Sequence, residues 1–565
     1  MVRSLRPDLA GEPGDGTRPL YPGTRPAFFP SMQGNYQELF PEFPYTGGAI
    51  LQHAPLFGTI GNHESPGRWR PNAQFQLNGI TQTATIDFMD NDPQPRWFAE
   101  IQYQRLKDAD PTFNPTNDPA FRTQWIRDNS YEFTQYFEMW NHPEDGPQGE
   151  SYWAYQLGDV FVVSMNVSRV WRTWNIQEGP EEARFSPRGK FTEFSSELND
   201  PSAWGFGDMW FETYGVDSEQ YEWLQGVLVS EAFKNAKYRV VIGHQTMFGV
   251  GDNSVPVMAN PVATITHETA GVTNTMTVTW PLDRTVWERD IQPLVDTNAI
   301  RDITYEYPLA NDVWKNDIEP LLLEHDVQLM HTGHSHVWNR ALVGDMNYIE
   351  TSNVGNSFGA YYTDTLGLWK ERVSWASSFW NELATPESRW DATNYPRTGD
   401  PHGRASIMPS EFNPMNELEG SERDLPFVDS NNVTAFTIFD TATGKVDSYA
   451  FDTRNPANPV RLFDSFTLKS AARFTSATEL PQPVVGQAFS FQFTAEGNPT
   501  PTFSVSAGEL PPGLTLSEDG LLSGVPSANG VYRFTVSATN NFGAPATQQI
   551  TLNLGEQLFL PMVYR

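Results

Sequence analysis

The sequence contains no cysteine. This absence excludes disulfide bonds, thiolate metal sites and cysteine nucleophiles together. The sequence also has no run of about 18 apolar residues, the length that a membrane-spanning helix requires. The first thirty residues are rich in proline and glycine and lack the apolar segment of a signal peptide. The sequence therefore predicts neither a transmembrane segment nor a signal peptide in this chain.

Positive charge is scarce: 37 Lys and Arg residues stand against 69 Asp and Glu residues, which gives a formal net charge of -32. Phosphate backbones are repelled by such a surface, so we expect no binding of a nucleic-acid backbone. Phosphate chemistry is still compatible with this charge, because metal cations can neutralise a site locally.

Aromatic residues are abundant, with 18 Trp, 20 Tyr and 37 Phe among 565 residues, so the chain can bury more than one core. From residue 474 to 554 charges become rare, and Thr, Ser, Val and Phe alternate in about seven short runs, as in an immunoglobulin-like sandwich. The stretch "LPPGLTLSEDGLLSGVPSANGVYRFTVSATN" resembles the Ig modules of bacterial secreted and surface proteins. We expect an Ig-like domain at 469–556, an apolar tail at 557–565, and a secreted or cell-surface protein. A surface or carbohydrate partner would bind through the Ig-like domain.

Before this domain, strands alternate with a few helices, which predicts a layered α/β architecture. The expected elements are a strand at 56–60, a hairpin at 151–167 that turns at Gly158-Asp159, a helix within 216–233 capped by Asp217, a strand at 238–243, a helix at 320–325 and a strand at 327–330. Residues 250–312 and 360–425 are predicted insertions, either surface elaboration or walls over a substrate cleft. Binding residues collect at the carboxyl ends of strands in such folds.

Three of these strand ends carry histidine: Gly61-Asn62-His63-Glu64, Gly243-His244 and Gly333-His334-Ser335-His336. Glycine lets the backbone turn sharply, so two imidazoles after a glycine can face adjacent metal positions. Mixed nitrogen and oxygen ligands suit Zn, Fe or Mn better than Ca or Mg. The remaining histidines carry no such pattern, and His331 is interpreted as a packing residue. The side chains of Asp345 and Glu350 either contact the metal ligands or are solvated.

The order GNHE, VxxH and GHxH resembles the last three of the five motifs of the calcineurin-like metallophosphoesterases. VxxH and the glutamate of GNHE are most similar to the purple acid phosphatase branch. The resemblance covers about residues 55–353, with family-like closing strands in "VTAFTIFDTATGKVDSYAFDT". It implies a four-layer domain over residues 1–468, with two mixed β-sheets flanked by helices.

The resemblance also implies roles for individual residues. Asn62, His244 and His334 would bind one metal ion, and His336 would bind the other. His63 would stabilise charge on the phosphoryl group or protonate the leaving oxygen, oriented by Glu64. Asn339 and Arg340 are candidates from their position alone, because they come soon after the GHxH histidines, and would contact the metal ligands or the substrate. Two ions of Fe, Zn or Mn would hold a hydroxide for in-line attack on a small or polymeric phosphate ester, either a monoester or a diester.

The first two family motifs, which supply the bridging aspartate, are not found in the sixty residues before Gly61. Gly14-Asp15-Gly16 is the one candidate, and no apolar strand leads into it. Either the sequence is the C-terminal part of a longer enzyme, or the domain has lost catalysis and serves as an extracellular binding or scaffold module. Retention of the later ligands favours the first hypothesis. A purely structural adhesin is the third. We expect weak or no hydrolysis by this polypeptide alone.

Overall fold

The computed structural model describes residues 57–555 with gaps. The residues left out within this range are 62–69, 78–79, 87–95, 131–132, 134–135, 138–139, 144–145, 147–148, 169–192, 194–197, 202–203, 205–211, 246, 248–249, 251–257, 281, 283, 353–401, 403, 421–423, 431 and 456. No helix in the described part of the chain combines the length and the apolar character needed to cross a membrane.

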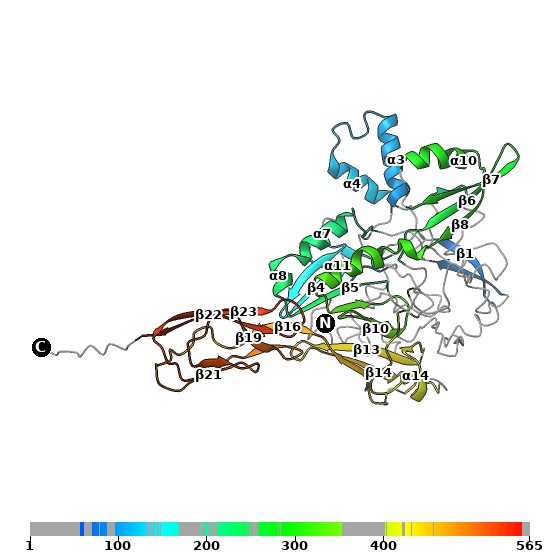
Figure 1. Cartoon of the computed structure of the whole chain (residues 1–565). Helices are drawn as coiled ribbons and strands as arrows, with labels where there is room; N and C mark the ends of the chain where they lie inside the picture. The colour runs from blue at the N-terminus through cyan, green and yellow to red at the C-terminus, as the bar shows by residue number, and fades with distance from the viewer. Residues whose placement is uncertain are drawn as a thin grey trace.

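A seven-stranded mixed sheet forms the centre of the first region, in the order β12-β10-β11-β9-β5-β4-β3. Figure 1 labels β4, β5 and β10 of this sheet. Its strands are β3 (Trp153–Leu157), β4 (Val160–Met165), β5 (Tyr238–Gly243), β9 (Leu329–Thr332), β10 (Trp338–Val343), β11 (Met346–Thr351) and β12 (Phe427–Val428). The four neighbours β4, β5, β9 and β11 are parallel, so their carboxyl ends lie at one edge of the sheet. The expected hairpin is confirmed as β3 and β4, with Gly158 at a φ of 59° in its turn.

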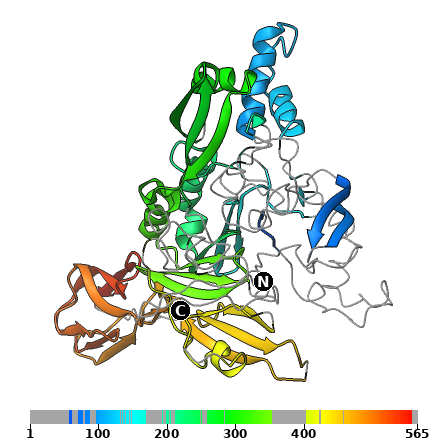
Figure 2. The ribbon, with the colours of Figure 1, turned by 90° about the vertical axis from the view of Figure 1, so that its right-hand side faces the viewer.

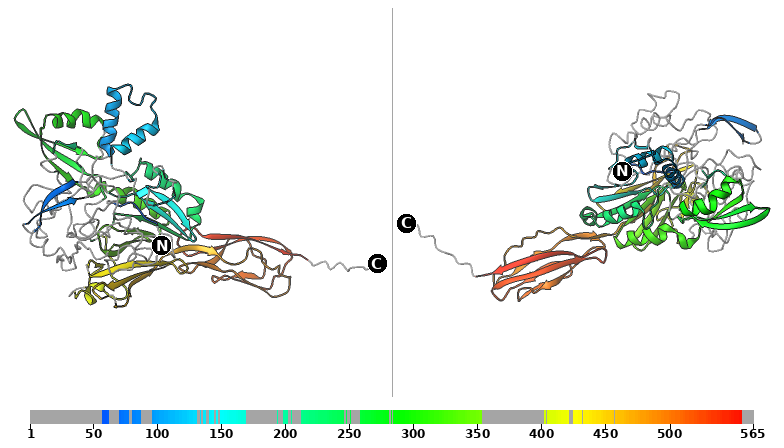
Figure 3. Two further views of the ribbon diagram at one scale, coloured as in Figure 1. Left: turned by 180° about the vertical axis from the view of Figure 1, so that it is seen from behind. Right: turned by 90° about the horizontal axis from the view of Figure 1, so that it is seen from above.

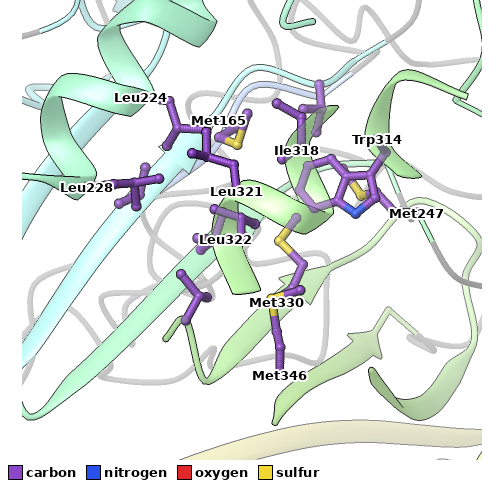
Figure 4. Close-up of a cluster of buried hydrophobic side chains, with 14 of the residues drawn as sticks. Met165, Leu224, Leu228, Met247, Trp314, Ile318, Leu321, Leu322, Met330 and Met346 are labelled. Atoms are coloured by element: carbon purple, nitrogen blue, oxygen red, sulfur yellow. The ribbon is translucent and has the colours of Figure 1, made fainter. Parts of the chain in front are cut away.

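Helices cover one face of this sheet. They are α7 (Glu219–Leu228), α8 (Glu231–Asn235) and α11 (Glu319–Glu324), the last preceded by the π-helical turn η7 (Trp314–Ile318). Figure 4 shows the core beneath them, where Leu224 and Leu321 approach Met165 and Met330 of the sheet. These side chains are almost completely buried, and their removal from water stabilises the layer.

A second sheet covers the opposite face. It is antiparallel, in the order β13 (Val433–Asp440), β14 (Lys445–Asp452) and β15 (Arg461–Thr467), and lies below β10 in Figure 1. Val240 and Ile349 of the central sheet share a buried cluster with Val446 of β14. Helices, the mixed sheet and this smaller antiparallel sheet therefore form three layers, called the layered region below, in the described part of the chain before residue 468. The short helix α14 (Pro414–Glu417) packs beside β12.

The predicted insertion at 250–312 contains a three-stranded antiparallel sheet (Figure 2). Its strands are β6 (Val262–Thr269), β7 (Val272–Thr279) and β8 (Ile300–Glu306), with β6 in the centre. The connection from β7 to β8 contains α9 (Arg284–Val286), η5 (Trp287–Ile291) and α10 (Gln292–Asp296), and the 3-10 turn η6 (Leu309–Asn311) follows β8. Helix α3 (Arg96–Ala109) packs on this unit through Phe98 and Trp287, whose rings are 5.2 Å apart, and α4 (Pro119–Asp128) packs on α3. Strands β1 (Arg70–Leu77) and β2 (Ile80–Ile86) form a separate hairpin.

Residues from 470 to 554 form a β-sandwich that projects from the layered region (Figure 3). Its strands are β16 (Ser470–Phe474), β17 (Phe489–Gln492), β18 (Ala495–Asn498), β19 (Thr502–Gly508), β20 (Leu514–Leu516), β21 (Leu521–Gly524), β22 (Gly530–Thr539) and β23 (Ala546–Leu554). Phe493, Leu522, Val536 and Leu552 lie in its core without measurable exposure. Apolar packing thus replaces the inter-sheet disulfide that a cysteine-free chain lacks.

Two local predictions are wrong. Residues 58–61 do not form a strand, because the backbone of this segment bonds to side chains instead of a ladder: the Tyr136 hydroxyl donates to the Gly58 carbonyl at 3.1 Å, and the Ser168 hydroxyl donates to the Ile60 carbonyl at 2.8 Å. The cap of α7 is Ser218, whose hydroxyl accepts from the Tyr221 amide at 3.1 Å. Asp217 has a φ of 70° and precedes the cap.

Candidate metal centre

Two of the three histidine loops meet at the edge of the central sheet. Strands β5 and β9 are parallel neighbours, paired as far as Ile242 and His331, so the residues that follow them emerge side by side. The Gly333 amide donates to the His244 carbonyl at 2.9 Å. The backbone therefore joins the VxxH loop to the GHxH loop directly, and the expected convergence of these two loops is observed.

The side chains of His244 and His334 face each other. Nε2 of His244 lies 3.0 Å from Nδ1 of His334, and the ring planes are inclined by 76°. Both residues are buried, with exposed fractions of 3% and 4%. Two nitrogen ligands that lie at right angles on one cation are about 3 Å apart, because each metal–nitrogen bond is about 2.1 Å long. The observed separation suits either a hydrogen bond or two lone pairs on one cation.

Gln245 fixes the other edge of the His334 ring. Its amide nitrogen lies 3.3 Å from Nε2 of His334, while its Oε1 is buried and has no hydrogen-bond partner among the described residues. The oxygen and nitrogen of a glutamine amide are assigned by their hydrogen bonds. Exchanging them lets Nε2–H of His334 donate to Oε1, which satisfies the buried oxygen and leaves the Nδ1 lone pair directed at His244. The donor set thus fits a cation bound by Nδ1 of His334.

The GHxH loop has an unusual backbone. His334 has a φ of 78° and His336 a φ of 59°, both in the left-handed region. The Ser335 amide donates to the Gly333 carbonyl at 3.0 Å, which closes a three-residue turn around His334. Such a γ-turn with positive φ is rare and strained, and residues in sparsely populated regions cost roughly 1–3 kcal/mol each. His336 is also buried, at 2% exposure.

Glu350 on β11 lies behind this loop. Its Oε1 accepts from the backbone amide of Ser335 at 2.8 Å and from the Ser352 hydroxyl at 2.9 Å. Its Oε2 accepts from the side-chain amide of Asn339 at 3.0 Å. Burial raises the pKa of the Glu350 carboxyl to about 8, although the three hydrogen bonds favour the charged form. Asn339 is thus a partner of Glu350, which places it behind the loop.

Arg340 has a different environment from the one expected for a substrate contact. Its guanidinium donates to both carboxylate oxygens of Asp464 on β15, from Nε at 2.9 Å and from Nη2 at 3.2 Å. The guanidinium also lies over the ring of Phe466, with Cζ of Arg340 at 4.4 Å from the ring centroid. Asp464 has no exposed surface. In this structure Arg340 joins the two facing sheets.

Three predicted site residues, Asn62, His63 and Glu64, lie outside the described residues, as do Gly14-Asp15-Gly16 and most of the 360–425 insertion. Gly61 is the last described residue before them, and the Ile60 carbonyl is bonded to Ser168, just beyond β4. Among the described residues, no group of three or more His, Asp or Glu side chains is placed to hold a metal ion. The described part of the site is therefore the pair His244 and His334 with the loop that continues to His336.

For Glu350 the sequence left open a contact to the metal ligands or a solvated position, and it did not single out Gln245. Gln245 directly follows the VxxH histidine, and Glu350 is an acidic residue in an otherwise buried strand pattern, "MNYIET". Both signals are visible in the sequence, but neither shows which loop the side chain reaches.

A family model described as "Putative Ig domain" matches residues 471–555. No curated protein matches the chain. Among solved structures, a protein of Bacteroides fragilis described as a "putative alpha-galactosidase" matches at 27% identity over 15% of this chain, with a TM-score of 0.14. A second B. fragilis protein, described as a "putative alpha-galactosidase/melibiase", matches at 22% identity over the same share, also with a TM-score of 0.14. Immunoglobulin domains 1–4 of Sidekick-1 match at 17% identity over 21% of this chain and 33% of theirs.

The chain covers 18% of the length of each B. fragilis protein. At these TM-scores, the likenesses carry no argument about the whole chain. The family model and the eight strands together establish a C-terminal Ig-like domain, which fits an extracellular or surface protein and is consistent with a binding module.

Proposed function

We propose that the layered region is a metal-dependent phosphoesterase of the calcineurin-like class, most similar to purple acid phosphatases, in a secreted or cell-surface protein. The observation that carries the proposal is the pair of buried imidazole nitrogens, His244 Nε2 and His334 Nδ1, 3.0 Å apart at the carboxyl ends of adjacent parallel strands. The substrate would be a phosphate monoester or diester, small or polymeric.

His244 and His334 would hold one cation together with Asn62, and His336 would hold a second. The cations, Fe, Zn or Mn, would polarise the phosphoryl oxygens and lower the pKa of water. Gln245 would keep Nε2 of His334 protonated, so that the lone pair of Nδ1 would be directed at the cation. Burial of both imidazoles excludes bulk water from this side of the site, which strengthens the attraction between the cation and the phosphoryl group.

His63 would donate a proton to the leaving oxygen or stabilise charge on the phosphoryl group, and Glu64 would orient it. The chain supplies three ligands for one cation and one for the other. We therefore expect firm binding of one metal ion and weak or no hydrolysis.

Metal analysis combined with hydrolysis assays tests this proposal. The purified protein is expected to bind Zn or Mn at one equivalent or more, and to hydrolyse p-nitrophenyl phosphate or bis(p-nitrophenyl) phosphate slowly. His334→Ala and His244→Ala should lose the bound metal, whereas His63→Ala should keep the metal and lose turnover. His267→Ala, at the half-buried end of β6, is the matched control. Full metal content in His334→Ala would contradict the assignment.

A further inference from the structure

The conformation of the GHxH loop depends on its surroundings. His334, at the centre of the three-residue turn, and His336 both have positive φ, which L-residues adopt where neighbouring groups over-determine the backbone. The residue between them, Ser335, has a single amide hydrogen, and two acceptors lie within its reach. One is the Gly333 carbonyl within the turn, at 3.0 Å. The other is Oε1 of Glu350, at 2.8 Å.

Glu350 comes from a rigid element. Strand β11 is the parallel neighbour of β9, with Glu350 paired to Thr332, so the carboxylate is delivered directly behind the loop that follows β9. Ser352 and Asn339 hold its two oxygens in place, at 2.9 Å and 3.0 Å. Asn339 lies on β10, which pairs with β11 on its other side. The orientation of the carboxylate is thus set by two strands of the central sheet.

We propose that Glu350 is a positioning residue. It holds the backbone of the GHxH loop in its left-handed conformation, so that Nδ1 of His334 faces Nε2 of His244. The part of this inference that concerns metal binding rests on the proposed function. The described contact of Glu350 with the loop is the hydrogen bond from the Ser335 backbone amide, so Glu350 acts through that group. A glutamate in this place explains why a buried acidic side chain accompanies two histidines of unfavourable backbone conformation.

The first test compares removal of the Glu350 carboxylate with removal of another carboxylate that is equally buried. Glu319, exposed by 1%, accepts hydrogen bonds from Tyr348 and Arg404 in the same region but does not reach the histidine loops. Glu350→Ala and Glu319→Ala are both expected to lower the free energy of unfolding. Only Glu350→Ala should weaken the binding of Zn²⁺ or Mn²⁺, measured by chelator competition well below the unfolding temperature, by about 10- to 100-fold.

The second test asks for rescue. Glu350→Gln keeps an oxygen for the Ser335 amide but brings two NH₂ groups together at Asn339. The double variant Glu350→Gln/Asn339→Asp exchanges the carboxamide and the carboxylate, which restores a donor opposite an acceptor. Metal affinity should follow the order wild type, double variant, Glu350→Gln, Glu350→Ala. Equal losses in Glu350→Ala and Glu319→Ala, or no loss in Glu350→Ala, would overturn the proposal.

A metal-free measurement separates this inference from the proposed function. In apo protein labelled with ¹⁵N-histidine, the imidazole shifts of His244 and His334 report the contact between their rings. Glu350→Ala should change these shifts, and Glu319→Ala should leave them unchanged. If wild-type protein binds no metal, the proposed function fails, while this result still decides whether Glu350 positions the loop. Unchanged shifts in Glu350→Ala would reject that role.

Discussion

The layered region and the Ig-like sandwich bury different kinds of side chain. The layered region buries Glu350, Glu319, Asp464 and Asp312, each at 3% exposure or less. The sandwich, which is described without gaps from 469 to 555, buries Ser470, Ser537 and Gln548 as its polar residues and no ionisable side chain. Both regions are free of cysteine, so neither compensates with disulfide bonds.

This difference separates two ways of stabilising a fold. The core of the sandwich is stabilised by apolar area removed from water, which varies little with pH or salt. A buried carboxylate costs desolvation free energy, which is offset only when its partners remain in place. The layered region therefore accepts buried ionisable groups at positions where a loop or a sheet must be held in one arrangement. The two regions have separate cores, so calorimetry should resolve two unfolding transitions.

The largest expected loss of stability comes from breaking the ion pair between Arg340 and Asp464. Arg340→Met leaves the Asp464 carboxylate buried with only the Ser410 amide, at 3.1 Å, as a described partner. The free energy of unfolding of the layered region should fall by about 3–5 kcal/mol, measured in denaturant. The transition of the sandwich should not move.

Two further variants sharpen this prediction. Arg340→Met/Asp464→Leu removes both charges and should recover most of the loss. Lys445→Met breaks a partly exposed ion pair between Lys445 and Asp447, which both lie on β14. This change should lower the free energy of unfolding by about 1 kcal/mol or less. If Arg340→Met left stability unchanged but raised KM for a phosphate ester, Arg340 would be a substrate contact after all.

The second-largest expected effect is the loss of stability at low pH that His142 causes. Its ring stacks on Trp153 and Trp140 at 4.8 Å and 5.5 Å, and its Nε2 accepts from the Gly58 amide at 3.3 Å. Burial lowers the pKa of this imidazole from 6.5 to about 4. The folded state binds this proton less readily than the unfolded state. The contribution of His142 to the free energy of unfolding is therefore complete above pH 6.5 and is lost as the pH falls toward 4.

A shift of this size corresponds to about 3 kcal/mol between pH 6.5 and 4. His142→Phe keeps an aromatic ring in the stack and removes the titrating group, so the free energy of unfolding of this variant should fall less over that range. The sandwich, without a buried ionisable side chain, supplies the internal reference in the same calorimetric scan. Parallel pH profiles for His142→Phe and wild type would show that other groups cause the acid sensitivity.

Local patterns were enough to predict much of the fold. The hairpin of β3 and β4 follows from Gly158-Asp159 between two apolar runs, and β5 and β9 follow from short apolar runs before histidines. The Ig-like domain follows from repeated short strands with turn residues between them. In each of these cases the signal lies within about ten residues, where propensity and periodicity decide the structure.

Non-local contacts account for what the sequence did not show. The segment at 58–61 satisfies its backbone through Tyr136 and Ser168, and no local pattern predicts those partners. The role of Glu350 depends on β11 pairing beside β9, although 18 residues separate their paired positions Glu350 and Thr332. Convergence of His244 and His334 was predictable because strand ends share an edge, whereas the left-handed turn at His334 was not.

The contact between the two regions gives the smallest expected effect. Lys237, before β5, lies 3.5 Å from Glu496 on β18, with the two side chains exposed by 13% and 40%. A partly exposed pair contributes about 0.2–1 kcal/mol, because solvent screens it and ordering two side chains costs entropy. In a double-mutant cycle with Lys237→Met and Glu496→Gln, the coupling free energy should stay in this range and shrink in high salt. A salt-insensitive coupling well above that range would mean that the pair is part of a buried interface, so that the sandwich and the layered region unfold as one cooperative unit.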